Sequence, residues 1–259
     1  MVTIKSEREV QLMREAGLIL AKVHKELEAY VRPGLSTLDL DTRCEKLIRS
    51  MGATPSFKGY CGFPASACVS VNEEVVHGIP SADRYIGEGD IVTLDVGVIW
   101  KGWQSDAART HAVGEIDPGV RDLIDRTRES FFVGIQAATD GARVNDIGRA
   151  IDDYISQFGY GIVEDLVGHG IGRDMHEEPE VPNFACRSRG IRLRKNMTIA
   201  VEPMINMGTW MVEETGNGWT FVTRDGAPSA HYENTILITD GAPEVLSLTP
   251  EEKKLYNVR

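Results

Sequence analysis

The sequence has little positive charge to offset its acids and no long apolar run. Its 28 Lys and Arg stand against 39 Asp and Glu, which gives a formal net charge of −11. Because no basic stripe counters this balance, nucleic acid as a substrate and an anionic membrane as a partner are disfavoured. No apolar stretch approaches bilayer-spanning length, and the opening MVTIKSEREV has charges where a secretory signal needs apolar residues. We therefore expect a cytoplasmic protein.

Cysteine is also scarce, and no two cysteines form a CxxC pair. In a cytoplasmic chain we expect free thiols rather than a disulfide framework or a zinc knuckle. The four are Cys44, Cys61, Cys68 and Cys186. A chain of 259 residues with 42% hydrophobic residues can bury a sizeable core. Since no low-complexity linker interrupts it, we expect one domain over residues 1–259.

Helical and strand-like patterns alternate along the chain, which indicates the α+β class. A helix is predicted between Ser6, which forms a possible capping box with Glu9, and the Pro33-Gly34 stop. Further helices are predicted at about 37–51, 120–138 and 146–158. Strands are predicted at 67–71 and 91–100, then after Lys101-Gly102, and at 197–205, 219–223 and 231–239.

An internal repeat relates the two halves of the chain. Gly34 aligns with Gly141 (141 − 34 = 107), and Asp39 aligns with Asp146 at the same offset. The same register also pairs Ile48 with Ile155, Gly52 with Gly159 and Asp95 with Glu202. A glycine turn, a capped helix and a later acidic strand therefore recur. The repeat predicts halves at about 10–115 and 120–245, related by a pseudo-twofold axis, with acidic residues facing each other at the centre.

Two acids lie where charge is least expected, on apolar strands. Asp95 is inside IVTLDVGVIW, and Asp106 follows on the return strand. If Lys101-Gly102 is a two-residue turn, Gly97 pairs with Asp106, so Asp95 and Asp106 are diagonal neighbours on one face. Such like charges persist together when a cation lies between them or when one is protonated.

Glu202 and Glu233 also lie in strand-like segments, and the latter is expected to share a face with His231. His169 lies among glycines in VGHGIGRDMHEEP, between the two acidic pairs in sequence. Taken singly, a strand acid is usually solvated and a lone histidine is usually structural. Together, four strand acids and one imidazole indicate a site for hard or borderline divalent ions, namely Mn, Fe, Co, Zn or Mg. Bridging carboxylates can hold two such ions, and their chemistry is hydrolysis.

In these motifs the chain resembles the type I methionine aminopeptidases of bacterial type. The motifs are VNEEVVHGIP, DIVTLDVGV, GHGIGRDMHEEP, TIAVEPM and HYENTI, and the similarity covers nearly the whole chain. The resemblance implies the pita-bread (creatinase/aminopeptidase) fold, a duplicated αβ unit around a central antiparallel sheet. It also implies a hydrolase that removes the initiator methionine from nascent proteins with a small second residue. The family's metal ligands map onto Asp95, Asp106, His169, Glu202 and Glu233.

The resemblance gives roles to further residues. His77 matches a histidine that contacts the substrate near the scissile bond, and His176 matches one that binds the scissile carbonyl oxygen. Glu202 is expected to shuttle the proton of the attacking water as well as to bind metal. A methionine pocket is expected from Tyr60, Phe63, Cys68, Met175 and Trp219. Some relatives have Phe where Met175 stands and Tyr where Phe63 stands, which leaves the pocket's shape open.

The resemblance also sets expectations about partners and rivals. We expect a monomer that contacts the ribosome transiently, and no amino-terminal zinc-binding extension or type II helical insertion is expected. An Xaa-Pro peptidase shares the fold and the ligands, but it usually carries a large amino-terminal domain. A non-catalytic binding protein on this fold would have lost ligands, whereas all five stand here.

Overall fold

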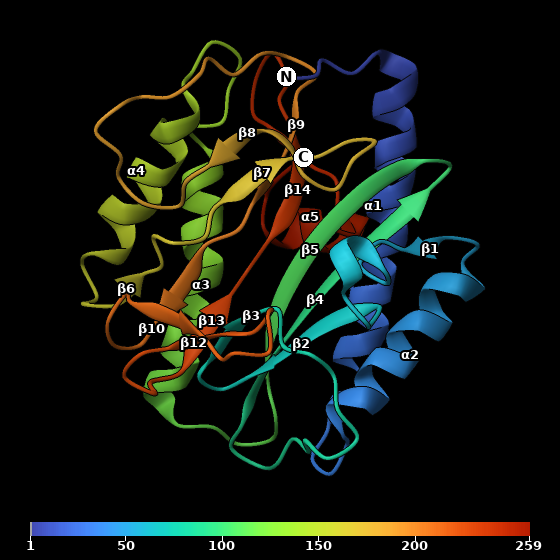
Figure 1. The fold of residues 1–259 in the computed structure, drawn as a ribbon. Helices are drawn as coiled ribbons and strands as arrows, with labels where there is room; N and C mark the ends of the chain where they lie inside the picture. Colours follow the sequence, from blue (N-terminus) through green and yellow to red (C-terminus); the bar gives the residue numbers. More distant parts are fainter. Residues whose placement is uncertain (1) are drawn as a thin grey trace.

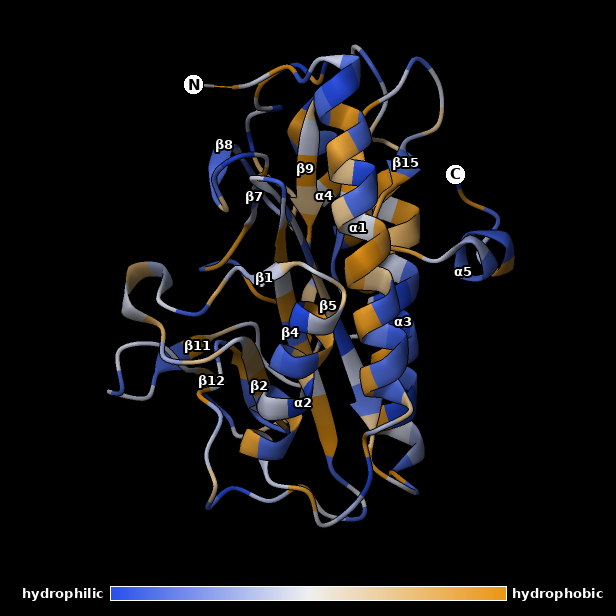
Figure 2. Ribbon diagram, turned by 90° about the vertical axis from the view of Figure 1, so that its right-hand side faces the viewer, coloured by the Kyte–Doolittle hydropathy of each residue, from blue (hydrophilic) through white to orange (hydrophobic). Residues whose placement is uncertain are grey.

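The computed structural model describes residues 2–259, and its helices lie against one side of the strands (Figures 1 and 2). Helices α1 (Glu7–Glu28) and α3 (Pro118–Ile135) are the long ones behind the sheets. Helices α2 (Thr37–Ser50) and α4 (Val144–Ile155) flank them, and α5 (Pro250–Leu255) follows near the carboxyl end. Within residues 2–259, none of the helices combines the length and apolar character that a bilayer crossing requires.

The first half is built on the hairpin of β4 (Ile91–Trp100) and β5 (Trp103–Ala112). Both turn residues are left-handed, with φ of 51° at Lys101 and 81° at Gly102, the backbone that a two-residue hairpin turn needs. Two shorter strands, β1 (Thr54–Pro55) and β2 (Ala67–Val71), also pair antiparallel with β4. Helix α1 packs on this hairpin. The predicted Ser6–Glu9 capping box at its start is confirmed.

The strands of the second half form three further antiparallel sheets, one of which includes β3 from the first half. Strands β7 (Gly168–Gly170), β8 (Glu177–Val181), β9 (Thr198–Val201), β14 (Asn234–Leu237) and β15 (Glu244–Val245) form the largest, in the order β15-β14-β9-β7-β8. A second contains β6 (Gly161–Ile162), β10 (Met204–Asn206) and β13 (Ser229–His231). A third contains β3 (Glu74–Val76), β11 (Val212–Glu214) and β12 (Phe221–Thr223).

The two halves meet along β5. The Glu233 amide donates a hydrogen bond to the Ala108 carbonyl (3.0 Å), and Arg109 bridges to Tyr232. The Thr235 hydroxyl, on β14, accepts from the Asp106 amide (2.9 Å) and donates to the Asp106 carbonyl (2.9 Å). Because the apolar clusters of each half lie on the helix side, the polar residues at this junction are held at the centre of the molecule.

The predicted repeat has matching local structure in both halves. Gly34 and Gly141 are left-handed, with φ of 87° and 88°. The Asp39 carboxylate accepts from the Ser36 amide (2.9 Å) at the start of α2, and Asp146 accepts from the Arg143 amide (3.1 Å) at the start of α4. These equivalences support the duplication, and the division at 10–115 and 120–245 stays a prediction.

Two segments that the sequence predicts as single strands are each interrupted, so these two predictions are wrong. The segment 197–205 divides into β9 and β10 at Glu202-Pro203, where proline has no amide hydrogen for a ladder. The segment 231–239 divides into β13 and β14 at Tyr232-Glu233. Both breaks therefore fall at predicted metal ligands.

Candidate metal centre and active site

Asp95 and Asp106 lie on one face of the β4–β5 hairpin. Gly97 is the partner of Asp106 across the ladder, as predicted, so Asp95 is its diagonal neighbour. Their relative exposures are only 8% and 4%. Two carboxylates are thus fixed side by side on one face of a buried strand pair.

Glu202 and Glu233 reach the same place from the two strand breaks. The Glu202 amide bonds to the Asn183 side-chain oxygen (3.3 Å) instead of a strand, and the Glu233 amide bonds to β5. Both side chains line the cavity that Asp95 and Asp106 line. The four acids therefore come together, although only two of them stand on strands.

His169 approaches the acids from β7, between Gly168 and Gly170. A Cβ atom at Gly170 would lie 2.2 Å from the Glu178 carbonyl oxygen, so the close passage of the backbone needs glycine. The His169 Nδ1–H donates to the Gly170 carbonyl (2.8 Å), which leaves the Nε2 lone pair free. That Nε2 is 3.7 Å from a Glu202 oxygen and 4.0 Å from an Asp106 oxygen.

The charges of this cluster are poorly compensated by the protein. Burial raises the pKa of Asp95 to about 7, and burial followed by neighbouring carboxylates raises the pKa of Asp106, Glu202 and Glu233 well above the usual range. Burial lowers the pKa of His169 to about 4, so its imidazole is neutral. Among residues 2–259, buried oxygens of Asp95, Asp106 and Glu233 have no hydrogen-bond partner.

These observations fit a divalent cation. One donor atom each from Asp106, His169 and Glu233 lie within 4.8 Å of one another. Carboxylate oxygens with one neutral imidazole are the ligands that such ions take, and a cation would satisfy the orphaned oxygens. A bound cation would thus account for a cluster of buried charges that the protein itself leaves uncompensated.

A cavity of about 330 Å³ opens beside the cluster, with an apolar wall. The Phe63 and Trp219 rings meet edge to face, with centroids 5.1 Å apart. Tyr60 and Cys68 also line this cavity, together with His77 and His176. Met175 does not line it; it is 1% exposed and packs behind the wall against Gly97 and Phe57.

His77 and His176 both line the cavity beside the acidic cluster. His77 follows β3 with a left-handed φ of 59°, and its carbonyl accepts from the Thr220 hydroxyl (3.2 Å). A non-glycine residue held in this region marks a backbone fixed by its surroundings. The His176 ring lies 4.3 Å from that of His169, centroid to centroid.

A buried ion pair behind the His176 loop has no counterpart in the sequence-based expectations. The Lys5 ammonium bonds to Glu177 (2.8 Å), and the side chains are 3% and 9% exposed. The other Glu177 oxygen accepts from the Arg173 amide (2.9 Å). Glu177 thus ties the loop that carries His176 to the amino-terminal segment, and only its position next to His176 in sequence hinted at a role.

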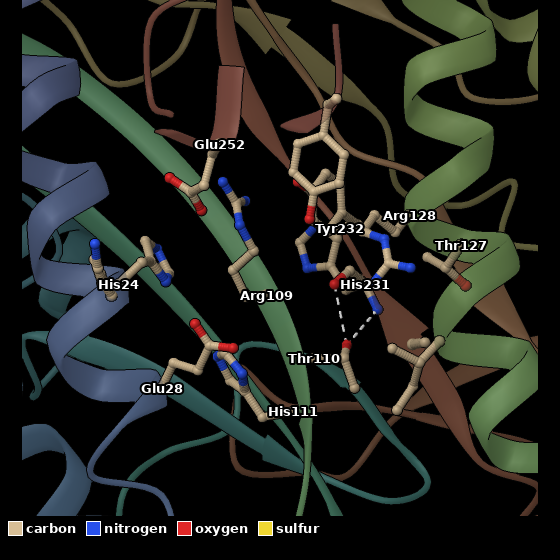
Figure 3. Close-up of a pocket in the computed structure, with 14 residues that line it drawn as sticks. His24, Glu28, Arg109, Thr110, His111, Thr127, Arg128, His231, Tyr232 and Glu252 are labelled. Carbon is tan, nitrogen blue, oxygen red and sulfur yellow. Dashed lines mark hydrogen bonds between the residues drawn. The ribbon is translucent and has the colours of Figure 1, made fainter. Parts of the chain in front are cut away.

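A second hollow lies on the helix side of β5 (Figure 3). The Arg109 guanidinium stacks on Tyr232 at 4.4 Å, donates to the Glu233 carbonyl and bonds to the Asn234 side chain (2.6 Å). Thr110 binds both the amide (2.9 Å) and the carbonyl (3.0 Å) of His231. These contacts fix the strand break that presents Glu233.

His231 corrects the expectation that it shares a face with Glu233. His231 lines the hollow on the helix side of β5, whereas Glu233 lines the cavity beside the acidic cluster, because the strand is broken between β13 and β14. The His231 Nε2 is nevertheless 3.8 Å from a Glu202 oxygen. Burial, together with the charges of His77 and Arg109, lowers its pKa to about 3.

Comparisons with known proteins place this site in context. The model of metallopeptidase family M24 matches residues 11–240. A methionine aminopeptidase of Clostridium acetobutylicum is 51% identical over 248 residues, which cover 96% of this chain and 99% of the relative. The crystal structure of a methionine aminopeptidase from Thermotoga maritima has a TM-score of 0.94 and 40% identity, over 96% of this chain and all of that one.

A more distant structure bears on the rival activity. An Xaa-Pro dipeptidase from Bacillus anthracis has a TM-score of 0.76 and 27% identity, and the match covers 95% of this chain but 62% of that one. The pita-bread fold is therefore confirmed and is common to both groups. The greater identity and the full coverage lie with the methionine aminopeptidases.

Proposed function

The chain belongs to the methionine aminopeptidases of metallopeptidase family M24, and we propose that it uses two divalent metal ions to remove the initiator methionine from nascent polypeptides with a small second residue. It is a hydrolase. The observation that carries the proposal is the convergence of four buried carboxylates and a neutral imidazole beside an apolar cavity. The proposed ligands are Asp95, Asp106, His169, Glu202 and Glu233.

Two divalent ions held by carboxylates supply an activated water and polarise the oxygen that it attacks. Four carboxylates exceed what one tetrahedral zinc ion needs, which supports two ions. Cobalt, manganese, iron, zinc and magnesium all accept this donor set. Since the donor set does not select among these metals, adding each of them to the metal-free protein would identify the one that supports activity.

Glu202 is the proposed proton shuttle. Its side chain is buried in the cluster, and the raised pKa that burial and Asp106 give it suits a group that takes up and releases a proton. His77 and His176 line the same cavity, where a ring N–H can donate to the developing oxyanion. We propose these three as the catalytic residues.

The methionine side chain is proposed to enter between Phe63 and Trp219. Their edge-to-face rings and the neighbouring Cys68 give an apolar, sulfur-tolerant wall suited to a thioether. Tyr60 lines the entrance and is 36% exposed. Met175 supports this wall from behind, so its predicted contact with the substrate is not part of the proposal.

The proposed substrate, the amino-terminal methionine of a nascent chain, suggests where the protein acts. We propose that it acts in the cytoplasm, contacts the ribosome transiently and works as a monomer. Sedimentation alone and with translating ribosomes would test both points. Residues 1–259 are proposed to form one catalytic domain of two duplicated halves.

The deciding experiment is metal reconstitution. The chelator-stripped protein would receive Mn, Co, Fe, Zn or Mg singly, and Met-Ala-Ser would be assayed beside Ala-Pro-Ala, with Glu202→Ala as control. Release of methionine alone, lost in the variant, would support the aminopeptidase. Cleavage of the Xaa-Pro peptide would move the activity to the sister group. Stoichiometric binding without turnover would favour a binding protein.

A further inference from the structure

Tyr60 makes a contact that a pocket-lining role does not require. Its hydroxyl lies 2.7 Å from the Nδ1 of His176, and the two rings are tilted by 41° with centroids 5.4 Å apart. Within residues 2–259, the His176 ring makes no other hydrogen bond. The ring of Tyr60 lies at the rim of the cavity, whereas Phe63 and Trp219 form the wall.

The loop that carries Tyr60 is rigid. The Gly59 amide bonds to the Phe63 carbonyl (2.8 Å), and the Phe63 amide bonds back to the Tyr60 carbonyl (2.9 Å). Gly59, Cys61 and Gly62 all have positive φ, and at Cys61 (48°) this conformation disfavours a side chain. Strain of this kind persists where surrounding contacts over-determine the backbone. These contacts fix the backbone at Tyr60, and the hydrogen bond to His176 is the contact that holds its hydroxyl.

The bond has a consequence for the proton on His176. Burial raises the pKa of the Tyr60 phenol, so the hydroxyl keeps its proton and can donate it. A neutral imidazole has one donor and one acceptor nitrogen, and its partner selects the tautomer. If Nδ1 accepts from Tyr60, the ring proton is on Nε2. That nitrogen is then a donor available to the cavity that His176 lines.

We propose that Tyr60 is a positioning residue, which holds His176 in the Nε2–H tautomer and aims this donor at the scissile carbonyl oxygen of the substrate. The catalytic part rests on the proposed function of His176. The tautomer itself does not, since it can be observed in the protein without metal or substrate. Donor geometry set in advance is the feature that makes such stabilisation effective.

The test compares the wild type with Tyr60→Phe, which keeps the ring and removes only the hydroxyl. Histidine ¹⁵N NMR of the metal-free protein, with His176→Ala identifying the signal among six histidines, is expected to show Nε2–H in the wild type and a tautomer mixture in the variant. A wild-type proton on Nδ1, or an unchanged tautomer in Tyr60→Phe, would overturn the proposal.

Kinetics supply the second readout. In the metal-loaded enzyme, Tyr60→Phe is expected to lower kcat for Met-Ala-Ser roughly tenfold and to change KM less than twofold. This is the pattern expected when a donor that acts only in the transition state is no longer aligned. In a His176→Ala background the same change is expected to have no further effect on kcat. A raised KM at constant kcat, or independent effects of the two changes, would make Tyr60 a wall residue instead. Failure of the wild type to release methionine would refute the proposed function but leave the NMR result standing.

Discussion

Replacing Asp95 by Asn is expected to stabilise the metal-free protein and to abolish metal-dependent turnover. The carboxyl is 8% exposed, one of its oxygens has no partner among residues 2–259, and burial raises its pKa to about 7 from an ordinary 3.8. A shift of one unit corresponds to about 1.4 kcal/mol, so keeping this group ionised above pH 7 costs the fold up to about 4 kcal/mol. Asparagine has nearly the same shape and no charge.

The sign of the pH dependence follows from the same shift. A carboxyl whose pKa is raised by folding binds its proton more tightly in the folded state, so stability falls as pH rises from about 4 to about 7 and then levels off. The wild type without metal should therefore lose stability over this range. The Asp95→Asn variant should lose less, because it lacks the Asp95 carboxyl. It should still lose some stability, because the carboxyls of Asp106, Glu202 and Glu233 remain.

The assay is thermal unfolding in chelator at pH 5 and pH 8, repeated with added Mn²⁺. At pH 8 the variant's melting temperature is expected to rise by at least about 5 °C, given roughly 2–4 °C per kcal/mol for a chain of this size. Added Mn²⁺ should stabilise the wild type more than the variant. The exposed Asp83→Asn serves as a control for net charge and should change neither state. A metal-free Asp95→Asn variant that melts at or below the wild-type temperature would refute the reasoning.

Three further predictions concern the surroundings of the site. Gly170→Ala places a Cβ 2.2 Å from the Glu178 carbonyl oxygen and should cost about 1–3 kcal/mol in urea unfolding, whereas Gly241→Ala, which meets no atom within 4 Å, should be near neutral; equal effects would contradict this. Lys5→Met leaves the buried Glu177 carboxylate without its ammonium partner and should cost about 3 kcal/mol, with part recovered in Lys5→Met/Glu177→Gln; strictly additive losses by the same measurement would show that the pair is not coupled. Met175→Leu should leave KM for Met-Ala-Ser unchanged, because the side chain lies behind the wall; a KM raised severalfold would restore Met175 to the pocket.

Local sequence signals were sufficient where a turn fixes a register. Lys101-Gly102 permits a two-residue hairpin turn, and this alone puts Asp95 and Asp106 on one face. The Ser6 capping box and the Asp39/Asp146 equivalence are also local, since a side chain bonds to backbone three residues away. Each of these predictions is confirmed because it depends on no distant contact.

The unpredicted features join residues far apart in the chain. The Lys5–Glu177, Arg109–Glu233 and Tyr60–His176 contacts each span more than 100 positions. No periodicity or turn chemistry encodes such a pairing. Alternation likewise predicted unbroken strands through Glu202 and Glu233, because both segments are apolar enough to be strands. The break at Glu202 follows from Pro203, which has no amide hydrogen for a ladder, and the Glu202 amide bonds to Asn183 instead. At the other break, the Glu233 amide bonds to the distant Ala108 carbonyl.

The balance of charge explains why binding and folding should be linked in this protein. Four buried carboxylates carry four negative charges when ionised. The Arg109 guanidinium lies on the other side of the sheet and offsets only part of the rise that burial and neighbouring carboxylates cause in the pKa of Glu233. Arg109 donates its hydrogen bonds to backbone and amide oxygens, not to a carboxylate. It therefore orients the Glu233 segment without neutralising the cluster. Two divalent cations would balance the four charges, so metal binding should add stability while the rear contacts keep the ligands in position.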